Sequence, residues 1–175
     1  MIVLRATRKV LSTLPKSASD ADESDTALGD WYVNRITIDR QPLLLLVSSK
    51  SLLAVLTPAR AVKTLPDRIG ALVAHRLRRI NIDEHLIRAE ARAMEVAVVG
   101  RTLDRSVTGQ MVDFAKAAPS YIPIGEVSDS TLRFVEDRLG ETPCRCSRPY
   151  AETIWPARDA ARLLAERWSG SRTVH

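Results

Sequence analysis

The chain of 175 residues has little cysteine and few aromatic residues: two cysteines, two phenylalanines, three tyrosines and three tryptophans. Cys144 and Cys146 are one residue apart, so in an extended chain their side chains point to opposite sides and cannot bridge each other. This excludes a disulfide-stabilised scaffold and favours a reducing, cytoplasmic setting. A Cys-x-Cys pair can belong to a metal site, but a second ligand pair is missing, so we expect no metal.

Long hydrophobic runs and familiar catalytic motifs are also missing. The most apolar stretch, residues 43–56, is interrupted by a Ser-Ser-Lys-Ser segment, so we expect no transmembrane helix and no membrane partner. The apolar start of the chain is cut by Arg5, so we expect no signal peptide. The sequence has no nucleotide-binding glycine loop, zinc signature or hydrolase elbow, and we expect no cofactor.

The chain does contain enough apolar sequence for a hydrophobic core. Hydrophobic residues make up 45% and charged residues 27%, which predicts a single folded domain over residues 1–168. Residues 16–27 are polar and acidic and predict a mobile loop, while residues 169–175 predict a frayed tail. The net charge of +5 favours an acidic partner such as nucleic acid, although the same charge can serve solubility alone.

Hydrophobic periodicity predicts an α+β fold. Helical spacing of apolar residues and capping residues predict helices over residues 8–14, 66–80, 107–118, 128–139 and 156–168, and one more behind a capping box of Asn81 and Glu84. Apolar or alternating runs predict strands over residues 2–6, 32–38, 43–47, 52–56 and 95–99. The segment 31–56 reads as an antiparallel meander of three strands. We expect a mainly antiparallel sheet of about five strands with helices packed on one face.

A candidate anion site lies in residues 96–116, where an apolar strand, a polar turn and a helix N-terminus follow one another. Free backbone N–H groups at the helix start, together with Arg101, Arg105 and Ser106, can hold a phosphate or a carboxylate. The alternative is structural: Asp104 or Ser106 caps the helix, and the arginines pair with Asp104 and Asp113.

A second candidate segment is Gly-Asp-Trp-Tyr at residues 29–32. Asp30 with Trp31 and Tyr32 can clamp a ligand or stack on a base, or they can form a tight turn followed by core aromatics. Arg5 on the first strand can share a polar floor with this segment. The arginine-rich run at residues 76–79 can contact a nucleic-acid backbone, or it can be a solvated helix face.

Several stretches, including MIVLRATRKVL, LGDWYVNR and GRTLDRSVTGQMVDF, resemble an uncharacterised bacterial family known only as a domain of unknown function. In that family the two motifs usually read close to L-G-D-W-Y-A-N and N-R-S-V-x-G-S-M-N-D-F. This chain departs from these motifs at Val33, Asp104, Gln110 and Val112. The resemblance implies a stand-alone cytoplasmic domain and carries no activity or cofactor. It also implies that nine motif residues act as a group: Gly29, Asp30, Trp31, Tyr32, Arg105, Ser106, Gly109, Met111 and Asp113.

These observations predict a small binding or regulatory protein with an anion pocket for nucleic acid or a nucleotide-like ligand. Arg101 and Arg105 supply charge, Ser106 and the helix start supply hydrogen bonds, and Trp31 or Tyr32 supplies a stacking face. One alternative is a metal-independent, toxin-like nuclease that uses Asp30, Tyr32, Arg105 and Asp113. Another is an interaction module of a toxin–antitoxin or defence pair, with a protein partner. The sequence does not fix the oligomeric state.

Overall fold

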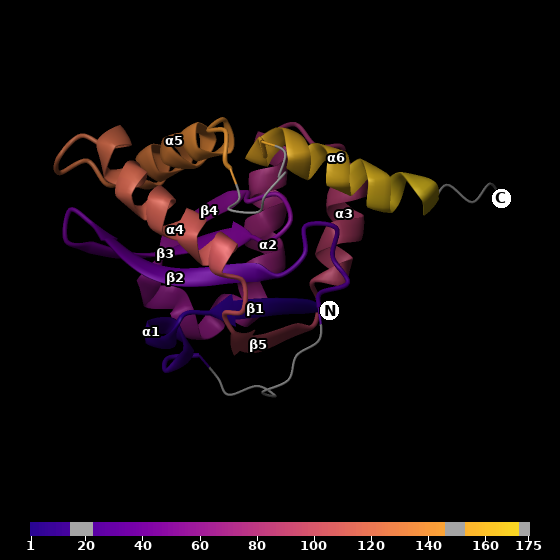
Figure 1. Ribbon diagram of the computed structural model, residues 1–175, viewed down its shortest axis with the longest axis horizontal. Coiled ribbons are helices and arrows are strands. Elements are labelled where there is room, and N and C mark those ends of the chain that lie inside the picture. Colours follow the sequence, from indigo (N-terminus) through magenta and orange to yellow (C-terminus); the bar gives the residue numbers. More distant parts are fainter. Residues whose placement is uncertain (15–22, 146–152, 172–175) are drawn as a thin grey trace.

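A five-stranded sheet forms the centre of the computed structural model, which describes residues 1–14, 23–145 and 153–171. The strands lie in the order β4-β3-β2-β1-β5, so β4 and β5 form the two edges (Figure 1). Their bounds are β1 (Ile2–Ala6), β2 (Trp31–Ile38), β3 (Gln41–Ser48), β4 (Ala54–Pro58) and β5 (Ala97–Arg101). The α+β class and the five strands agree with the sequence prediction.

The sheet is mixed, so the expectation of a mainly antiparallel sheet is met only in part. Strands β2, β3 and β4 form the predicted antiparallel meander, but β1 pairs in parallel with both β2 and β5. Parallel neighbours need long crossover connections, and the chain supplies them. One connection runs from residue 7 to residue 30 and includes α1 (Arg8–Leu11); the other runs from β4 to β5 through two long helices.

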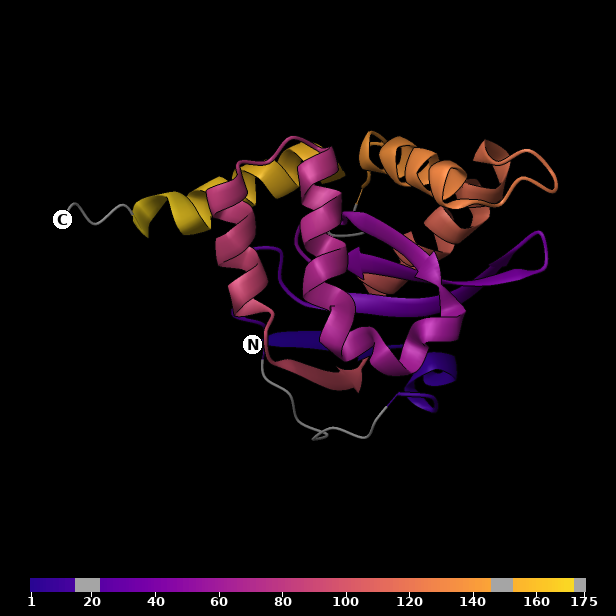
Figure 2. The same cartoon turned by 180° about the vertical axis from the view of Figure 1, so that it is seen from behind.

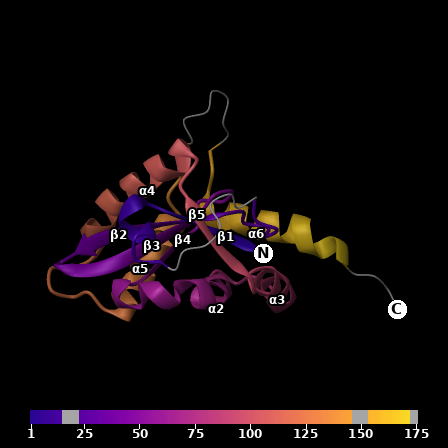
Figure 3. The same ribbon diagram turned by 90° about the horizontal axis from the view of Figure 1, so that it is seen from below.

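Helices cover both faces of the sheet, not one face as the sequence analysis predicted. On one face lie α2 (Leu65–Arg79) and α3 (Glu84–Ala93), and α6 (Pro156–Trp168) adds Ala160 and Leu164 to the same core. On the other face lie α4 (Arg105–Ala117) and α5 (Asp129–Gly140) (Figures 2 and 3). Three short 3-10 turns, η1 (Ala59–Thr64), η2 (Ala118–Tyr121) and η3 (Ser169–Ser171), complete the described elements.

The sequence of β3 explains why both faces need helices. Leu44 and Leu46 enter the core beneath α2, whereas Leu43, Leu45 and Val47 enter the core beneath α4 and α5. Successive side chains of a strand point to opposite faces, so a continuous apolar run must be covered on both sides.

Individual element boundaries follow the predictions closely. The bounds of β1 and α6 agree with the predicted ranges, and Ser128 caps α5 as expected. The predicted capping box is wrong, because Asp83 precedes α3 and Asn81 has a φ of 58° in the turn before it. Strand β5 begins two residues later than predicted, and α1 ends at Leu11. No helix in the described ranges is both long and apolar enough to cross a membrane.

Residues 16–22 of the predicted mobile loop lie outside the described residues. Cys146 and residues 172–175 of the predicted tail also lie outside them. The end of this loop is ordered, because Thr26 and Ala27 are buried. The buried Glu90 carboxylate of α3 accepts hydrogen bonds from the main-chain N–H groups of Ala27 and Leu28, at 2.8 and 3.1 Å. This contact fixes the approach to the Gly-Asp-Trp-Tyr segment.

Candidate functional site

The two segments singled out in the sequence meet at one cavity of about 760 Å³. We call it the motif pocket, because Gly29, Asp30 and Tyr32 line it from one segment and Asp104 and Ser106 from the other. Its remaining lining comes from residues 23–24 and 49–50, from Leu103 and Val107, from Ile154, and from Arg162 and Leu163 of α6. The structure therefore brings together part of the predicted two-sided site.

Arg5 and Asp30 form a buried ion pair at the floor of this region. The Arg5 Nε donates to Asp30 Oδ2 at 2.7 Å, and Asp30 Oδ1 accepts from the main-chain N–H and the hydroxyl of Ser24, at 2.9 and 2.7 Å. Gly100 lies opposite Arg5 in the register of β1 and β5. A Cβ at Gly100 would lie 3.0 Å from Arg5 Nη1, so this glycine leaves room for the guanidinium. The Asp30 carboxylate is thus already neutralised and hydrogen-bonded.

Tyr32 and the start of α4 are linked through the main chain of Asp104. The Tyr32 hydroxyl accepts a hydrogen bond of 2.9 Å from the Asp104 N–H, and Asp104 Oδ1 accepts one of 2.7 Å from the Ser106 N–H. The capping role proposed as the alternative for Asp104 is therefore confirmed. The Ser106 hydroxyl is buried, and it has no hydrogen-bond partner within the described chain.

The structure does not bring the other predicted residues to the motif pocket. Arg101, Arg105 and Asp113 are exposed and are not among its lining residues. The proposed pairing of these arginines with Asp113 is absent from the described residues. Trp31 is 0% exposed in the core on the α2 side, so the expectation that it offers a stacking face is wrong. The four groups proposed for a nuclease are consequently divided between this pocket and the outer surface.

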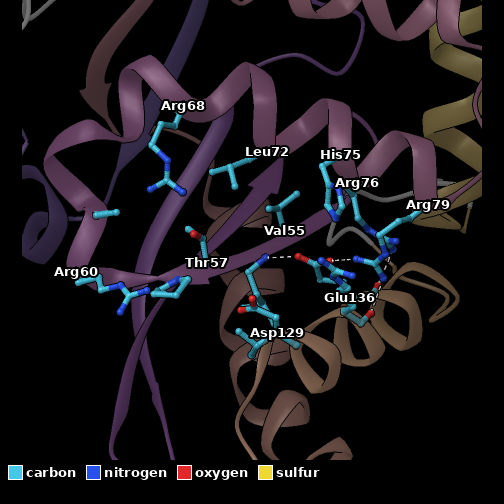
Figure 4. A pocket seen from close by; sticks show the side chains of 15 residues that line it. Val55, Thr57, Arg60, Arg68, Leu72, His75, Arg76, Arg79, Asp129 and Glu136 are labelled. Carbon is cyan, nitrogen blue, oxygen red and sulfur yellow. Dashed lines mark hydrogen bonds and ion pairs between the residues drawn. The ribbon is translucent and has the colours of Figure 1, made fainter.

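A second cavity of about 360 Å³ lies at the edge of the sheet between α2 and α5. We call it the arginine pocket, because Arg60 of η1, Arg68, Arg76 and Arg79 of α2, and Arg133 of α5 line it. Strand β4 supplies its floor. Figure 4 shows Arg60 and Arg68 at one end of the cavity, Val55 and Leu72 between, and Arg76, Arg79 and Glu136 at the other end.

Two of the five arginines join α2 to α5. Arg76 donates from Nη1 to Asp137 Oδ1 at 2.6 Å and from Nη2 to the Glu136 carbonyl at 2.7 Å. Arg79 pairs with both the Glu136 carboxylate and Asp137, and it donates to the Arg133 carbonyl at 2.7 Å. The sequence analysis offered a solvated face for residues 76–79. That interpretation is wrong for Arg76, which is 1% exposed and holds two helices together.

Burial changes the protonation equilibria in this network. It lowers the pKa of the Arg76 guanidinium, against the opposing charges of Glu136 and Asp137. Burial also raises the pKa of the Glu136 carboxyl, while the hydrogen bond from the Leu56 N–H and the charges of Arg76 and Arg79 act to lower it. The Arg76 Nε has no hydrogen-bond partner among the described residues, although it is buried. Unsatisfied buried donors of this kind are rare in folded proteins.

The other three arginines of the pocket have no acidic partner in the part of the chain that the structure describes. The side chains of Arg60, Arg68 and Arg133 make no ion pair there, and His75 adds an exposed imidazole to the same lining. Arginine stays protonated and presents a planar fork of N–H donors that matches phosphate or carboxylate. The arginine pocket therefore has the charge and geometry of an anion site.

Sequence reasoning found this site only in part. Only the run at residues 76–79 was proposed from the sequence as a contact with nucleic acid, and Arg68 and Leu72 were not assigned to this site. Arg60 and Arg133 were missed, because they are separated by more than seventy positions in the chain and meet only through the docking of α5 beside β4.

Residues 3–159 match the model of a family described as a domain of unknown function, DUF6933. No curated protein and no solved structure matches the chain.

Proposed function

The chain belongs to the DUF6933 family, whose description states no activity, and we propose from its geometry that it binds a phosphate-bearing ligand in the arginine pocket. The ligand class is the one expected from the sequence, nucleotide-like or nucleic acid. The proposed place differs, because the cavity between α2 and α5 gathers more unpaired positive charge than the start of α4.

The observation that carries this proposal is the gathering, around one concave cavity, of three arginines that have no acidic partner among residues 1–14, 23–145 and 153–171. Like charges repel one another, so their gathering at Arg60, Arg68 and Arg133 lowers stability until an anion neutralises them. Arg76 and Arg79 are engaged with α5 and hold the shape of the pocket. Arg76 and Arg79 therefore form a wall of the pocket, and the guanidinium groups of Arg60, Arg68 and Arg133 remain for the ligand.

Phosphate is favoured over carboxylate as the ligand's anionic group for two reasons. A phosphate has more acceptor oxygens and more charge than a carboxylate, so it can engage several guanidinium groups at once. The volume of about 360 Å³ also lies within the usual range for small-molecule sites, roughly 300–1,000 Å³. A mononucleotide or a terminal phosphate of a nucleic acid fits these requirements.

The test is calorimetric titration of the full chain with pyrophosphate, a nucleotide mixture and a short single-stranded RNA at low salt. We expect binding that weakens steeply as salt rises, because ion release accompanies phosphate contacts. The double substitution Arg60→Ala with Arg68→Ala should weaken binding at least tenfold, a loss of about 1.4 kcal/mol or more. Arg105→Ala, an exposed arginine on α4, serves as the matched control.

Two results would count against the proposal. If none of the three ligands binds at low salt, the arginine pocket is not an anion site. If Arg105→Ala weakens binding and the double substitution does not, the ligand lies at the start of α4, where the sequence analysis placed it.

A further inference from the structure

The arginine pocket is divided along its length, and this division restricts its ligand beyond the presence of a phosphate. Two unpaired arginines, Arg60 and Arg68, lie at one end, and the buried Arg76 lies at the other (Figure 4). Between them lie the apolar side chains of Leu72 and Val55, with Thr57 and His75 beside them. An isolated phosphate ion would occupy one end and leave the rest of the cavity unfilled.

The apolar middle comes from three elements. Leu72 of α2 is half-buried, while Val55 of β4 and Leu132 of α5 are buried beside it. Figure 4 shows Leu72 beside Val55, and Leu132 adds apolar surface to the lining from α5. Such a slot suits a flat ring, whose burial removes apolar surface from water.

Polar side chains of the lining can pair with the edge of that ring. Arg76, a lining residue, has an Nε that lacks a partner in the described chain but is closed to solvent, so an acceptor of the ligand reaches it only if the side chain shifts. Asp129 of α5, also in the lining, carries an exposed carboxylate that can accept from an amine or a hydroxyl. Adjacent donor and acceptor groups are what the edge of a nucleobase presents.

We infer that the ligand of the arginine pocket is a nucleoside monophosphate. Its phosphate lies between Arg60 and Arg68, its base lies against Leu72, and an acceptor on the base edge faces Arg76 Nε. This inference rests on the proposed function and adds the base as the group that gives selectivity.

The experiment compares the four nucleoside monophosphates, ribose 5-phosphate and inorganic phosphate in calorimetric titrations of the full chain. At least one nucleoside monophosphate should bind about tenfold tighter than ribose 5-phosphate, since the base adds buried apolar area. Leu72→Ala should bring that affinity down to the level of ribose 5-phosphate and leave the sugar phosphate unaffected. Leu163→Ala, a half-buried leucine of α6, is the matched control, and thermal unfolding checks that both variants fold.

The possible results distinguish failure of the nucleotide inference from failure of the proposed function. If all phosphate compounds bind with the same affinity and depend on Arg60 and Arg68, the nucleotide inference is overturned and the proposed function stands. If an RNA oligonucleotide binds and no mononucleotide does, the inference is likewise overturned. If Leu72→Ala and Leu163→Ala weaken nucleotide binding equally, the base does not occupy the slot. If no phosphate compound binds, both fail.

Discussion

The Glu136 carboxylate of α5 accepts a hydrogen bond of 2.7 Å from the main-chain N–H of Leu56 on β4, eighty positions earlier in the chain. Strand β4 is an edge of the sheet, so this N–H would otherwise lack a neighbouring strand. The same carboxylate pairs with Arg79 of α2. One buried side chain therefore joins the sheet edge to both helices that form the arginine pocket, and exposed strand edges of this kind are prone to pair with other chains.

Glu136→Ala should lower the free energy of unfolding by about 3–5 kcal/mol, because it leaves the buried Leu56 N–H without an acceptor and removes one of the two carboxylates that pair with Arg79. Urea denaturation followed by circular dichroism measures the change. Glu141→Ala is the control: among the described residues its carboxylate makes only an exposed contact with Arg138, so a change within about 0.5 kcal/mol is expected. Equal effects of the two substitutions would contradict the structural role of Glu136.

Asp30→Ala should also destabilise the protein by about 3–5 kcal/mol, because it leaves the buried Arg5 guanidinium without its carboxylate. Adding Arg5→Met to Asp30→Ala should recover part of this loss, since residues in one ion pair act non-additively. The readout is a double-mutant cycle from urea denaturation. Strict additivity of the two single effects would show that the pair is not coupled.

Gly29 and Gly109 should respond to alanine in opposite directions. Gly29 has a φ of +75°, and an added Cβ would lie 2.4 Å from Ser49 Oγ, so Gly29→Ala should destabilise by about 1–3 kcal/mol. Gly109 is exposed within α4 and has no atom within 4 Å of an added Cβ, so Gly109→Ala should stabilise by about 0.5–1 kcal/mol. Thermal and urea unfolding of both variants measure the difference, and the same sign for both would refute the assignment of strain to residue 29.

Glu90 should make stability depend on pH. Burial raises the pKa of its carboxyl, while hydrogen bonds from Ala27, Leu28 and Trp168 oppose that shift. The folded state therefore keeps the proton to a higher pH than the unfolded state does. The resulting stabilisation is complete below the ordinary glutamate pKa, about 4.3, and is lost as pH rises through the raised value.

Glu90→Gln removes this titrating group, so its free energy of unfolding should fall less steeply than that of the wild type between about pH 4 and the raised pKa. Urea denaturation at a series of pH values measures both slopes. Glu136 titrates in the same direction in both proteins, so some slope remains in the variant. Parallel curves for wild type and variant would show that Glu90 does not contribute.

Local features of the fold were predictable from the sequence. The meander β2–β3–β4 depends on two tight turns, and its residues alternate between the faces as the pattern indicates, with Tyr32 and Ile36 on one side and Val33 on the other. The position of β1 between β2 and β5 was not predictable in the same way. It depends on pairing between residues 2–6 and 97–101, which no local pattern records.

The sequence also did not predict which single side chains line the candidate site. The meeting of residues 29–32 with the start of α4 was anticipated, yet Ser106 lines the motif pocket and Arg105 does not. Consecutive residues of a helix point about 100° apart, so the rotation of the helix decides which neighbour faces inward. That rotation is set by Val107 and Met111 packing against the sheet, a tertiary contact.

The parallel pairing of the first and fifth strands has a consequence for biosynthesis. Residues 2–6 leave the ribosome early, but their partner strand at residues 97–101 is still to be made. At roughly 5–20 residues per second, translation takes about 5–20 s to supply it. During that interval the nascent polypeptide holds Ile-Val-Leu-Arg-Ala, a segment that is buried along its whole length in the folded protein, with one side unprotected, and we expect chaperone engagement to be strongest before the fifth strand emerges.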